Sequence, residues 1–171
     1  MKFNRYIIIL MTVFTTVFTS CMKDNEVILE GSFVEFDAAT YNANGAGLTY
    51  PILTRVPRYG EPQNNADPAI TRASGTIKFR INLVGPHRST PTTVGYTVLA
   101  TGTTAVAGTH YTTGNTVTIP ANSSFAEIEV QVLNTGTSSS TARDLVLELT
   151  GASDLAPSPN EKRLGIRISQ L

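Results

Sequence analysis

The sequence predicts an all-β protein, an antiparallel two-sheet sandwich of about seven short strands that follows an amino-terminal signal peptide. Two observations support the sandwich. From Gly31 onward, apolar residues recur at alternate positions, which is the period of a strand with one buried face. Glycine, proline and asparagine turns separate these stretches, and no helical period is sustained between them.

The first twenty residues have the organisation of an export signal. Lys2 and Arg5 precede an uncharged, proline-free run from Tyr6 to Phe18. This run is shorter than the ~20 residues that a helix needs to cross a bilayer core, and charged residues follow from Lys23 onward. We therefore expect residues 1–20 to be a signal peptide and not a permanent transmembrane segment.

Cys21 is the only cysteine in the chain. With the three residues before it, Phe18-Thr19-Ser20, it resembles a bacterial lipobox. The resemblance implies that the Cys21 thiol is joined to diacylglycerol, that the preceding peptide is removed and that the new amino group is acylated. Each buried methylene contributes roughly 0.8 kcal/mol, so two or three acyl chains would anchor the protein in a membrane. The alternative is an unmodified thiol beside an ordinary signal-peptide cleavage site.

Residues 21–30 are expected to form a tether. Met22-Lys23-Asp24-Asn25-Glu26 resembles the charged, acid-rich stretches that follow the lipidated cysteine in surface-exposed lipoproteins of Bacteroides-type bacteria. The resemblance implies a protein that is lipid-anchored in the outer membrane, at the cell surface or facing the periplasm. The alternative is a solvated tether with no sorting role.

Residues 31–171 are expected to form one domain, because their length suits a single core and one cysteine cannot form a disulfide scaffold. In chain order, the apolar residues that mark the strands are Phe33 and Phe36; Ile77, Phe79, Ile81 and Leu83; Val94, Tyr96 and Val98; Val117 and Ile119; Ile128, Val130 and Val132; Leu145, Leu147 and Leu149; and Leu164, Ile166 and Ile168.

One connection, Thr54 to Ser74, is much longer than the others, and a long ordered loop in a compact domain is often functional. Tyr50, Arg55, Arg58 and Tyr59 lie in or beside it. Aromatic faces and guanidinium groups together can hold sugars or peptides, so we predict that these four residues form a ligand-binding loop. The other interpretations are a mobile insertion and a core position for Tyr50.

The stretch from Val94 to Asn134 resembles a Calx-beta domain. It contains VGYTV at 94–98, GTTAVAGTHY at 102–111, TVTIPAN at 116–122 and IEVQVLN at 128–134. It is also similar to related domains of unknown function in Bacteroides-type lipoproteins, in which GTHY occurs. The resemblance covers roughly Thr76 to Ile168 and implies an immunoglobulin-like β-sandwich.

The chain departs from the Calx-beta pattern at its acidic positions. In that family an Asp stands where His110 stands here, an acidic residue stands at Thr135, and acidic residues populate the next turn. Here, residues 136–143 carry no carboxylate and Asp144 follows alone. Calcium requires several oxygen ligands, largely carboxylates, so we expect no calcium site of the family's type and no cofactor.

Little in the sequence suggests catalysis. His87 and His110 are the only histidines, and we expect His110 to pack or to form hydrogen bonds at a strand end. Glu127 and Glu129 share a strand face and could act as a glycosidase pair, but alternate polar positions on a solvent-facing strand are the simpler interpretation. We therefore expect a protein that is not an enzyme.

The net charge of the chain argues against nucleic acid as a partner. The chain has 13 basic and 13 acidic side chains and no net charge, so it lacks the basic surplus that attracts proteins to nucleic acid. We therefore expect a non-catalytic binding or adhesion module with a glycan or protein ligand. The alternative is a structural or assembly subunit of an envelope complex that pairs with a partner through an exposed strand edge.

Overall fold

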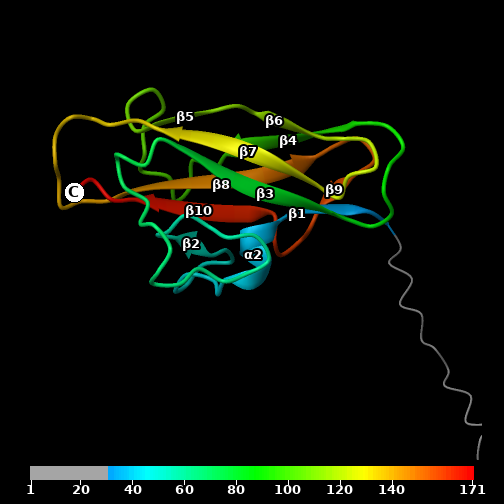
Figure 1. Cartoon of the computed structure of the whole chain (residues 1–171), viewed down its shortest axis with the longest axis horizontal. Helices are drawn as coiled ribbons and strands as arrows, with labels where there is room; N and C mark the ends of the chain where they lie inside the picture. The colour runs from blue at the N-terminus through cyan, green and yellow to red at the C-terminus, as the bar shows by residue number, and fades with distance from the viewer. Residues whose placement is uncertain (1–30) are drawn as a thin grey trace, which may run out of the picture.

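The computed structural model describes residues 31–171, which form a two-layer β-sandwich (Figure 1). The first sheet has the strand order β5-β7-β3-β1-β9, and the second sheet has the order β2-β10-β8-β4-β6. The predicted signal peptide, Cys21 and the tether lie outside the described residues.

The elements are β1 (Phe33–Phe36), α2 (Asp37–Tyr41), β2 (Ile52–Leu53), β3 (Thr76–Val84), β4 (Thr92–Val98), β5 (Tyr111–Thr113), β6 (Thr116–Ile119), β7 (Phe125–Val132), β8 (Arg143–Gly151), β9 (Ala156–Pro157) and β10 (Arg163–Ile168).

All seven predicted strands are present, and the alternating pattern that predicted them is also their burial pattern. In β3, Ile77, Phe79, Ile81 and Leu83 are buried between the sheets, whereas the residues between them face outward. The three additional strands, β2, β5 and β9, are two or three residues long. Strands of that length are too short to display an alternating period.

Two strand pairs differ from the predicted antiparallel arrangement. β1 pairs with β9 in parallel, and β2 pairs with β10 in parallel. Both parallel partners are two-residue strands at the edge of their sheet. Long connections precede β2 and follow it, so its direction is not fixed by a tight hairpin. Both sheets are therefore mixed.

The core lies between the two sheets and is almost entirely apolar. Burial of such side chains is the main favourable contribution to folding, about 1.5–3 kcal/mol for each large one. The largest fully buried side chains are Phe36, Phe79, Leu53, Ile70, Ile81, Ile119, Ile128, Leu145, Leu147, Leu149, Leu155 and Leu164.

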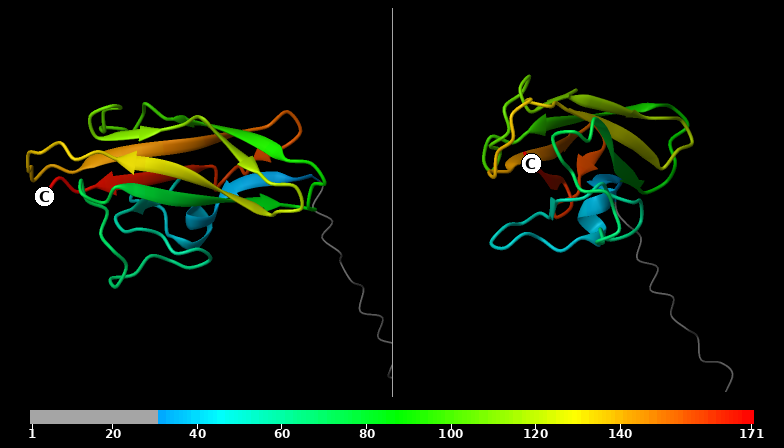
Figure 2. Two further views of the ribbon diagram at one scale, coloured as in Figure 1. Left: turned by 45° about the horizontal axis from the view of Figure 1, so that its top comes forward. Right: turned by 60° about the vertical axis from the view of Figure 1, so that its left-hand side comes forward.

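A lobe made of α2 and the connections on either side of β2 projects from the sandwich beside the edge strand β2, and α2 itself contacts β3, β1 and β10 (Figures 1 and 2). The short helix α2 was not predicted; its Ala38 and Ala39 join the core. Buried Asp37 holds the lobe to the first sheet, because its carboxylate accepts hydrogen bonds from the Gly60 amide and the Asn82 side chain. No helix in residues 31–171 is long and apolar enough to cross a membrane.

Candidate ligand groove on the second sheet

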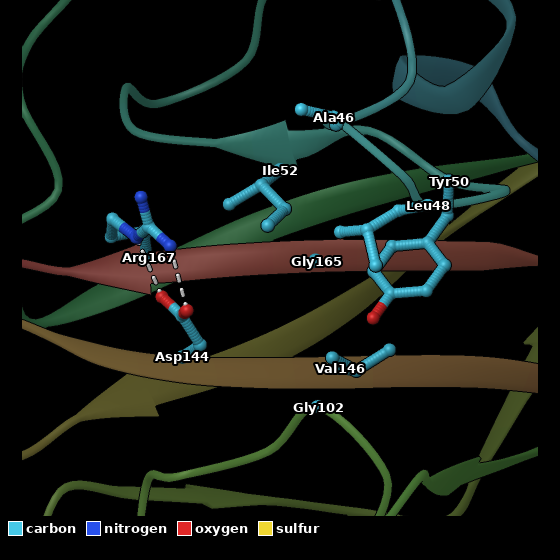
Figure 3. A pocket seen from close by; sticks show the side chains of 10 residues that line it. Ala46, Leu48, Tyr50, Ile52, Gly102, Asp144, Val146, Gly165 and Arg167 are labelled. Atoms are coloured by element: carbon cyan, nitrogen blue, oxygen red, sulfur yellow. Dashed lines mark hydrogen bonds and ion pairs between the residues drawn. The ribbon is translucent and has the colours of Figure 1, made fainter.

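A groove of about 470 Å³ lies on the outer face of the second sheet, where the segment before β2 folds over β8 and β10 (Figure 3). Its volume is within the range of small-molecule sites, roughly 300–1,000 Å³. We call it the Tyr50 groove. It is lined by Gly45, Ala46, Leu48, Tyr50, Ile52, Gly102, Asp144, Val146, Gly165 and Arg167.

Two glycines allow the Tyr50 ring to lie against the sheet. A Cβ at Gly165 of β10 would lie 3.3 Å from Tyr50 Cε2 and 3.1 Å from the carbonyl oxygen of Pro51. A Cβ at Gly102 would lie 2.7 Å from the Tyr50 hydroxyl, and the φ of +88° at Gly102 also favours glycine. The sequence thus leaves space for the ring at both contacts.

The Tyr50 hydroxyl is available to a ligand. Although Tyr50 as a whole is buried, its hydroxyl lines the groove and points toward Val146 in Figure 3. Among the hydrogen bonds within residues 31–171, none involves this hydroxyl. A phenol hydroxyl both donates and accepts, so it can bind a ligand hydroxyl in either direction.

An ion pair closes the other end of the groove. Arg167 of β10 and Asp144 of β8 are direct neighbours in the strand register. Arg167 Nε and Nη2 each donate to one Asp144 carboxylate oxygen at 2.8 Å, which is the bidentate geometry preferred by a guanidinium and a carboxylate. The hydrogen bond to Asp144 raises the pKa of Arg167 above its ordinary value. The guanidinium and the carboxylate together carry no net charge.

Apolar side chains complete the lining. Leu48 and Ile52 are half-buried, and Val146 forms part of the floor. Their surfaces lie between the Tyr50 hydroxyl and the Asp144–Arg167 pair (Figure 3). The groove therefore combines an apolar middle with polar groups that can donate and accept, and it offers no unpaired charge.

The structure places the four residues of the predicted ligand-binding loop in different surroundings. Tyr50 lies in the groove. Arg55 Nη1 donates to the carbonyl of Asp67 at 2.7 Å, and Arg58 pairs with the Asp67 carboxylate at 3.0 Å. Arg58 and Arg55 therefore stabilise a turn of the long connection around buried Asp67.

Tyr59 lies on the outer face of the first sheet, away from the groove. Its hydroxyl donates to Glu127 Oε1 at 2.6 Å. The Arg80 guanidinium lies 5.2 Å from the centre of the Tyr59 ring and 3.8 Å from the centre of the Phe125 ring, at distances typical of cation–π contacts. Tyr59 and Tyr50 thus belong to two separate surfaces.

Glu127 and Glu129 are bound to a lysine on that same face. Lys78 Nζ lies 3.0 Å from Glu127 and 3.5 Å from Glu129, and the two carboxylates project from an outward-facing side of β7, as expected. Hydrogen bonds from Tyr59 and then Lys78 lower the pKa of Glu127, whereas burial and the Glu127 hydrogen bond raise the pKa of Tyr59 to about 12. The pKa shift of Glu127 therefore comes mainly from its contacts with Tyr59 and Lys78, whereas the pKa shift of Tyr59 comes first from burial and then from the Glu127 contact.

His110 has the role that its position at a strand end predicted. It is buried immediately before β5, and its Nδ1 accepts a hydrogen bond from the Val106 amide at 2.9 Å. The start of the segment after β7 lies beside it, since the Leu133 amide donates to the His110 carbonyl at 2.9 Å. In residues 31–171 no three His, Cys, Asp or Glu side chains are grouped so that they could hold a metal ion.

An arginine side chain occupies this region of the fold. Arg72 Nη1 donates to the Asn134 side-chain oxygen at 3.1 Å, and its Nη2 donates to the Ser138 hydroxyl at 3.0 Å. The turn after β7 is therefore held by a guanidinium from the long connection. The sequence alone did not indicate this contact, because 62 positions separate Arg72 from Asn134.

Most of the groove was also not predicted from the sequence. Asp144 and Arg167 are separate, ordinary polar positions until the β8–β10 register makes them neighbours. Gly102 and Gly165 look like turn or strand glycines until Tyr50 is placed against them. Of the residues proposed from sequence, Tyr50 alone lines the groove.

Solved structures with a similar fold include the apo form of the Calx CBD1 domain, with 13% identity and a TM-score of 0.52 over 82% of this chain and 99% of that chain. CBD12 from CALX1.2 has 16% identity and a TM-score of 0.50, over 58% of this chain and 40% of that chain. A two-domain protein of unknown function from Bacteroides fragilis NCTC 9343 has 10% identity and a TM-score of 0.51, over 81% of this chain and 45% of that chain.

The chain matches no protein-family model and no curated protein sequence. At these identities the structural likeness concerns the fold, and it agrees with the resemblance carried by residues 94–134. The described part of the chain has the immunoglobulin-like β-sandwich fold of Calx-beta domains.

Proposed function

We propose that this protein is a non-catalytic binding module of the outer membrane, anchored through acyl chains on Cys21, and that it binds a neutral glycan in the Tyr50 groove. The observation that supports the proposal is the groove itself. It has at one end a tyrosine hydroxyl that makes no hydrogen bond within residues 31–171, a charge-neutral bidentate pair at the other end and apolar surface between them. A sugar ring has the matching features, hydroxyl groups around its edge and C–H surface on its faces.

The size of the groove favours a glycan over a protein ligand. A volume of about 470 Å³ accommodates a small molecule or a short stretch of a chain. A stable protein partner covers about 800 Å² on each side, and it would have to contact the surface well beyond this groove.

The short strands at the sheet edges argue against the alternative function, an assembly subunit of an envelope complex. Assembly by strand addition needs a long unpaired edge. The four strands at the sheet edges, β5, β9, β2 and β6, are between two and four residues long, whereas the long strands β3, β7 and β8 lie inside the sheets.

The test uses the full-length protein, purified in detergent, and a glycan array that contains neutral and acidic glycans. We expect neutral glycans to bind and Tyr50→Phe to weaken their binding about three- to ten-fold, because the ring stays and one ligand hydrogen bond is lost. Tyr41→Phe is the matched control, because Tyr41 is an exposed tyrosine that does not line the groove. Equal binding by both variants, or no binding of any neutral glycan, would exclude this site.

The anchor needs a separate test because Cys21 lies outside the described residues. Cys21→Ser should abolish labelling by a radioactive fatty acid and leave uncleaved precursor. Labelling that persists in this variant would exclude Cys21 as the attachment site. Protease treatment of intact cells then distinguishes display at the cell surface, where the domain is digested, from an orientation toward the periplasm.

A further inference from the structure

The Tyr50 groove is one of three hollows that follow β10 along the outer side of the molecule. The Asn160 hollow, about 520 Å³, is lined by Asn44, Leu48, Thr49, Pro159, Asn160 and Glu161. The Ser169 hollow, about 250 Å³, includes Thr54, Arg55, Arg167 and Ser169. Residues 159–161 come just before β10 and Ser169 comes just after it, so the three hollows lie at its beginning, middle and end.

Shared side chains make the three hollows neighbours. Leu48 lines both the Asn160 hollow and the Tyr50 groove. Arg167 lines both the Tyr50 groove and the Ser169 hollow. From Glu161 to Ser169 an extended chain advances roughly 26 Å at ~3.3 Å per residue. The hollows thus form one track, several times longer than a single sugar ring is wide.

The charges along this track balance. Glu161 and Asp144 are acidic, and Arg55 and Arg167 are basic. Asp144 and Arg167 are already paired with each other. A track without surplus charge suits a neutral chain, since an anionic or cationic polymer would need opposite charges along its length to replace its hydration.

The backbone of β10 is not free to pair with an extended peptide. One edge of β10 pairs with β8 along its whole length. Along the other edge, the Gly165 amide donates to the Pro51 carbonyl, the Ser169 amide donates to the Ile70 carbonyl, and the Arg72 amide donates to the Ser169 carbonyl. A ligand on this track must therefore bind to side chains, which excludes strand addition here.

We propose that the track along β10 binds a linear neutral oligosaccharide, with the Tyr50 groove as its central subsite and the Asn160 and Ser169 hollows as subsites for the sugars on either side. This inference rests on the proposed function, because it extends the glycan site of the Tyr50 groove in both directions. Asn44, Asn160, Thr54 and Ser169 supply neutral hydrogen-bonding groups at the two ends.

Chain length is the first measurement. Full-length protein is titrated by calorimetry with mono- to hexasaccharides of neutral β-linked glucose, xylose and mannose and of α-linked glucose. In the series that binds, we expect Kd to fall by at least about ten-fold between the disaccharide and the hexasaccharide, as added sugars gain hydrogen bonds worth roughly three- to ten-fold each.

Variants at the two ends are the second measurement. Asn160→Ala and Thr54→Ala should each weaken binding of the hexasaccharide about three- to ten-fold and leave binding of the disaccharide unchanged. Asn65→Ala and Thr90→Ala are the matched controls, because both positions are exposed and line none of the three hollows. The controls should bind both sugars as the unmodified protein does.

The outcomes separate this inference from the proposed function. If the disaccharide binds and is sensitive to Tyr50→Phe, but affinity does not rise with length or the end variants have no effect, the extended track is wrong and the central site stands. If no neutral sugar binds at millimolar concentration, both are wrong. Tighter binding of polygalacturonate than of any neutral chain would contradict the charge argument.

Discussion

The phenol of Tyr59 donates a hydrogen bond to the Glu127 carboxylate, with 2.6 Å between Oη and Oε1, although 68 positions separate the two residues in the chain. This contact fixes the long connection from Thr54 to Ser74 to the outer face of the first sheet. Gly60, next to Tyr59, is fixed as well, because its amide donates to Asp37 at 2.8 Å. The other end of the connection is hydrogen-bonded through Ile70 and Arg72 to Ser169, the residue after β10, so the connection contacts both sheets.

Tyr59→Phe removes the hydroxyl of this contact and keeps the ring beside Arg80. We expect the free energy of unfolding to fall by about 1 kcal/mol, the value of one partly exposed hydrogen bond to a charged group. Denaturant titration at neutral pH measures the change. Tyr41→Phe, at an exposed tyrosine of α2, should have almost no effect, and equal losses in the two variants would contradict a role for the hydroxyl.

The same contact makes stability depend on pH through Glu127. Because the pKa of Glu127 is lowered in the folded protein, the ionised form stabilises the fold above the ordinary glutamate value of 4.5, and this contribution is lost as the pH falls through the folded pKa. We expect the unfolding free energies of the unmodified protein and Glu127→Gln to converge in acid. An NMR titration should place the Glu127 midpoint below 4.5; a midpoint above that value would contradict the prediction.

Gly165→Ala tests the close approach of Tyr50 and β2 to β10. The new methyl group would meet the Pro51 carbonyl at 3.1 Å and Ile52 Cγ1 at 3.0 Å, and the carbonyl is part of the backbone, so it cannot move without shifting the start of β2. We expect a loss of about 1–3 kcal/mol of stability and weaker glycan binding. Gly114→Ala is the control, since its Cβ would have one close neighbour, the Tyr96 hydroxyl at 3.2 Å. A fully stable Gly165→Ala protein would show that β2 is loosely held.

His110→Ala should leave the Val106 amide without its acceptor. The cost is about 1–3 kcal/mol of unfolding free energy, because a polar group in a partly buried position loses its partner. His110→Asn can supply an oxygen acceptor near the same place and should recover part of the loss. His87→Ala, at an exposed position in the connection between β3 and β4, serves as the control and should be neutral in thermal unfolding.

Calcium titration tests the departure from the Calx-beta acidic pattern. The turn after β7 binds the Arg72 guanidinium through Asn134 and Ser138, so a fixed positive charge lies where the resemblance would otherwise suggest a cation. We expect no heat of calcium binding in the micromolar range. A site of micromolar or tighter affinity would overturn this expectation, and Arg72→Ala would then show whether the two cations compete.

The strands and the core could be predicted because each depends on neighbours in the chain. The alternation of Ile77, Phe79 and Ile81 with polar residues marks a strand wherever it folds, and β3 has this burial pattern. The parallel pairing of β2 and β9 could not be predicted, since two-residue strands have no period. Their directions depend on where long connections return to the sheets.

The candidate site, like the fold, could be predicted from the sequence only in part. Tyr50 was identified from its residue type beside a long connection. Asp144 and Arg167 were not, because their pairing depends on the register of two strands that are brought together in the sheet. Tyr59 and Arg58 were expected to share a site with Tyr50, but Tyr59 binds Glu127 on the first sheet and Arg58 binds Asp67 within its own connection.

The sequence by itself determined the fold class, through local alternation, and it carries the lipobox-like segment at Cys21, which depends on adjacent residues alone. Only the tertiary structure decided which polar side chains face one another. The groove, the Asp144–Arg167 pair and the track along β10 arise from strand register and from the folding of the 45–52 segment over the second sheet. The physical reason is that these contacts join residues far apart in the chain, and their partners are set by packing of the whole core.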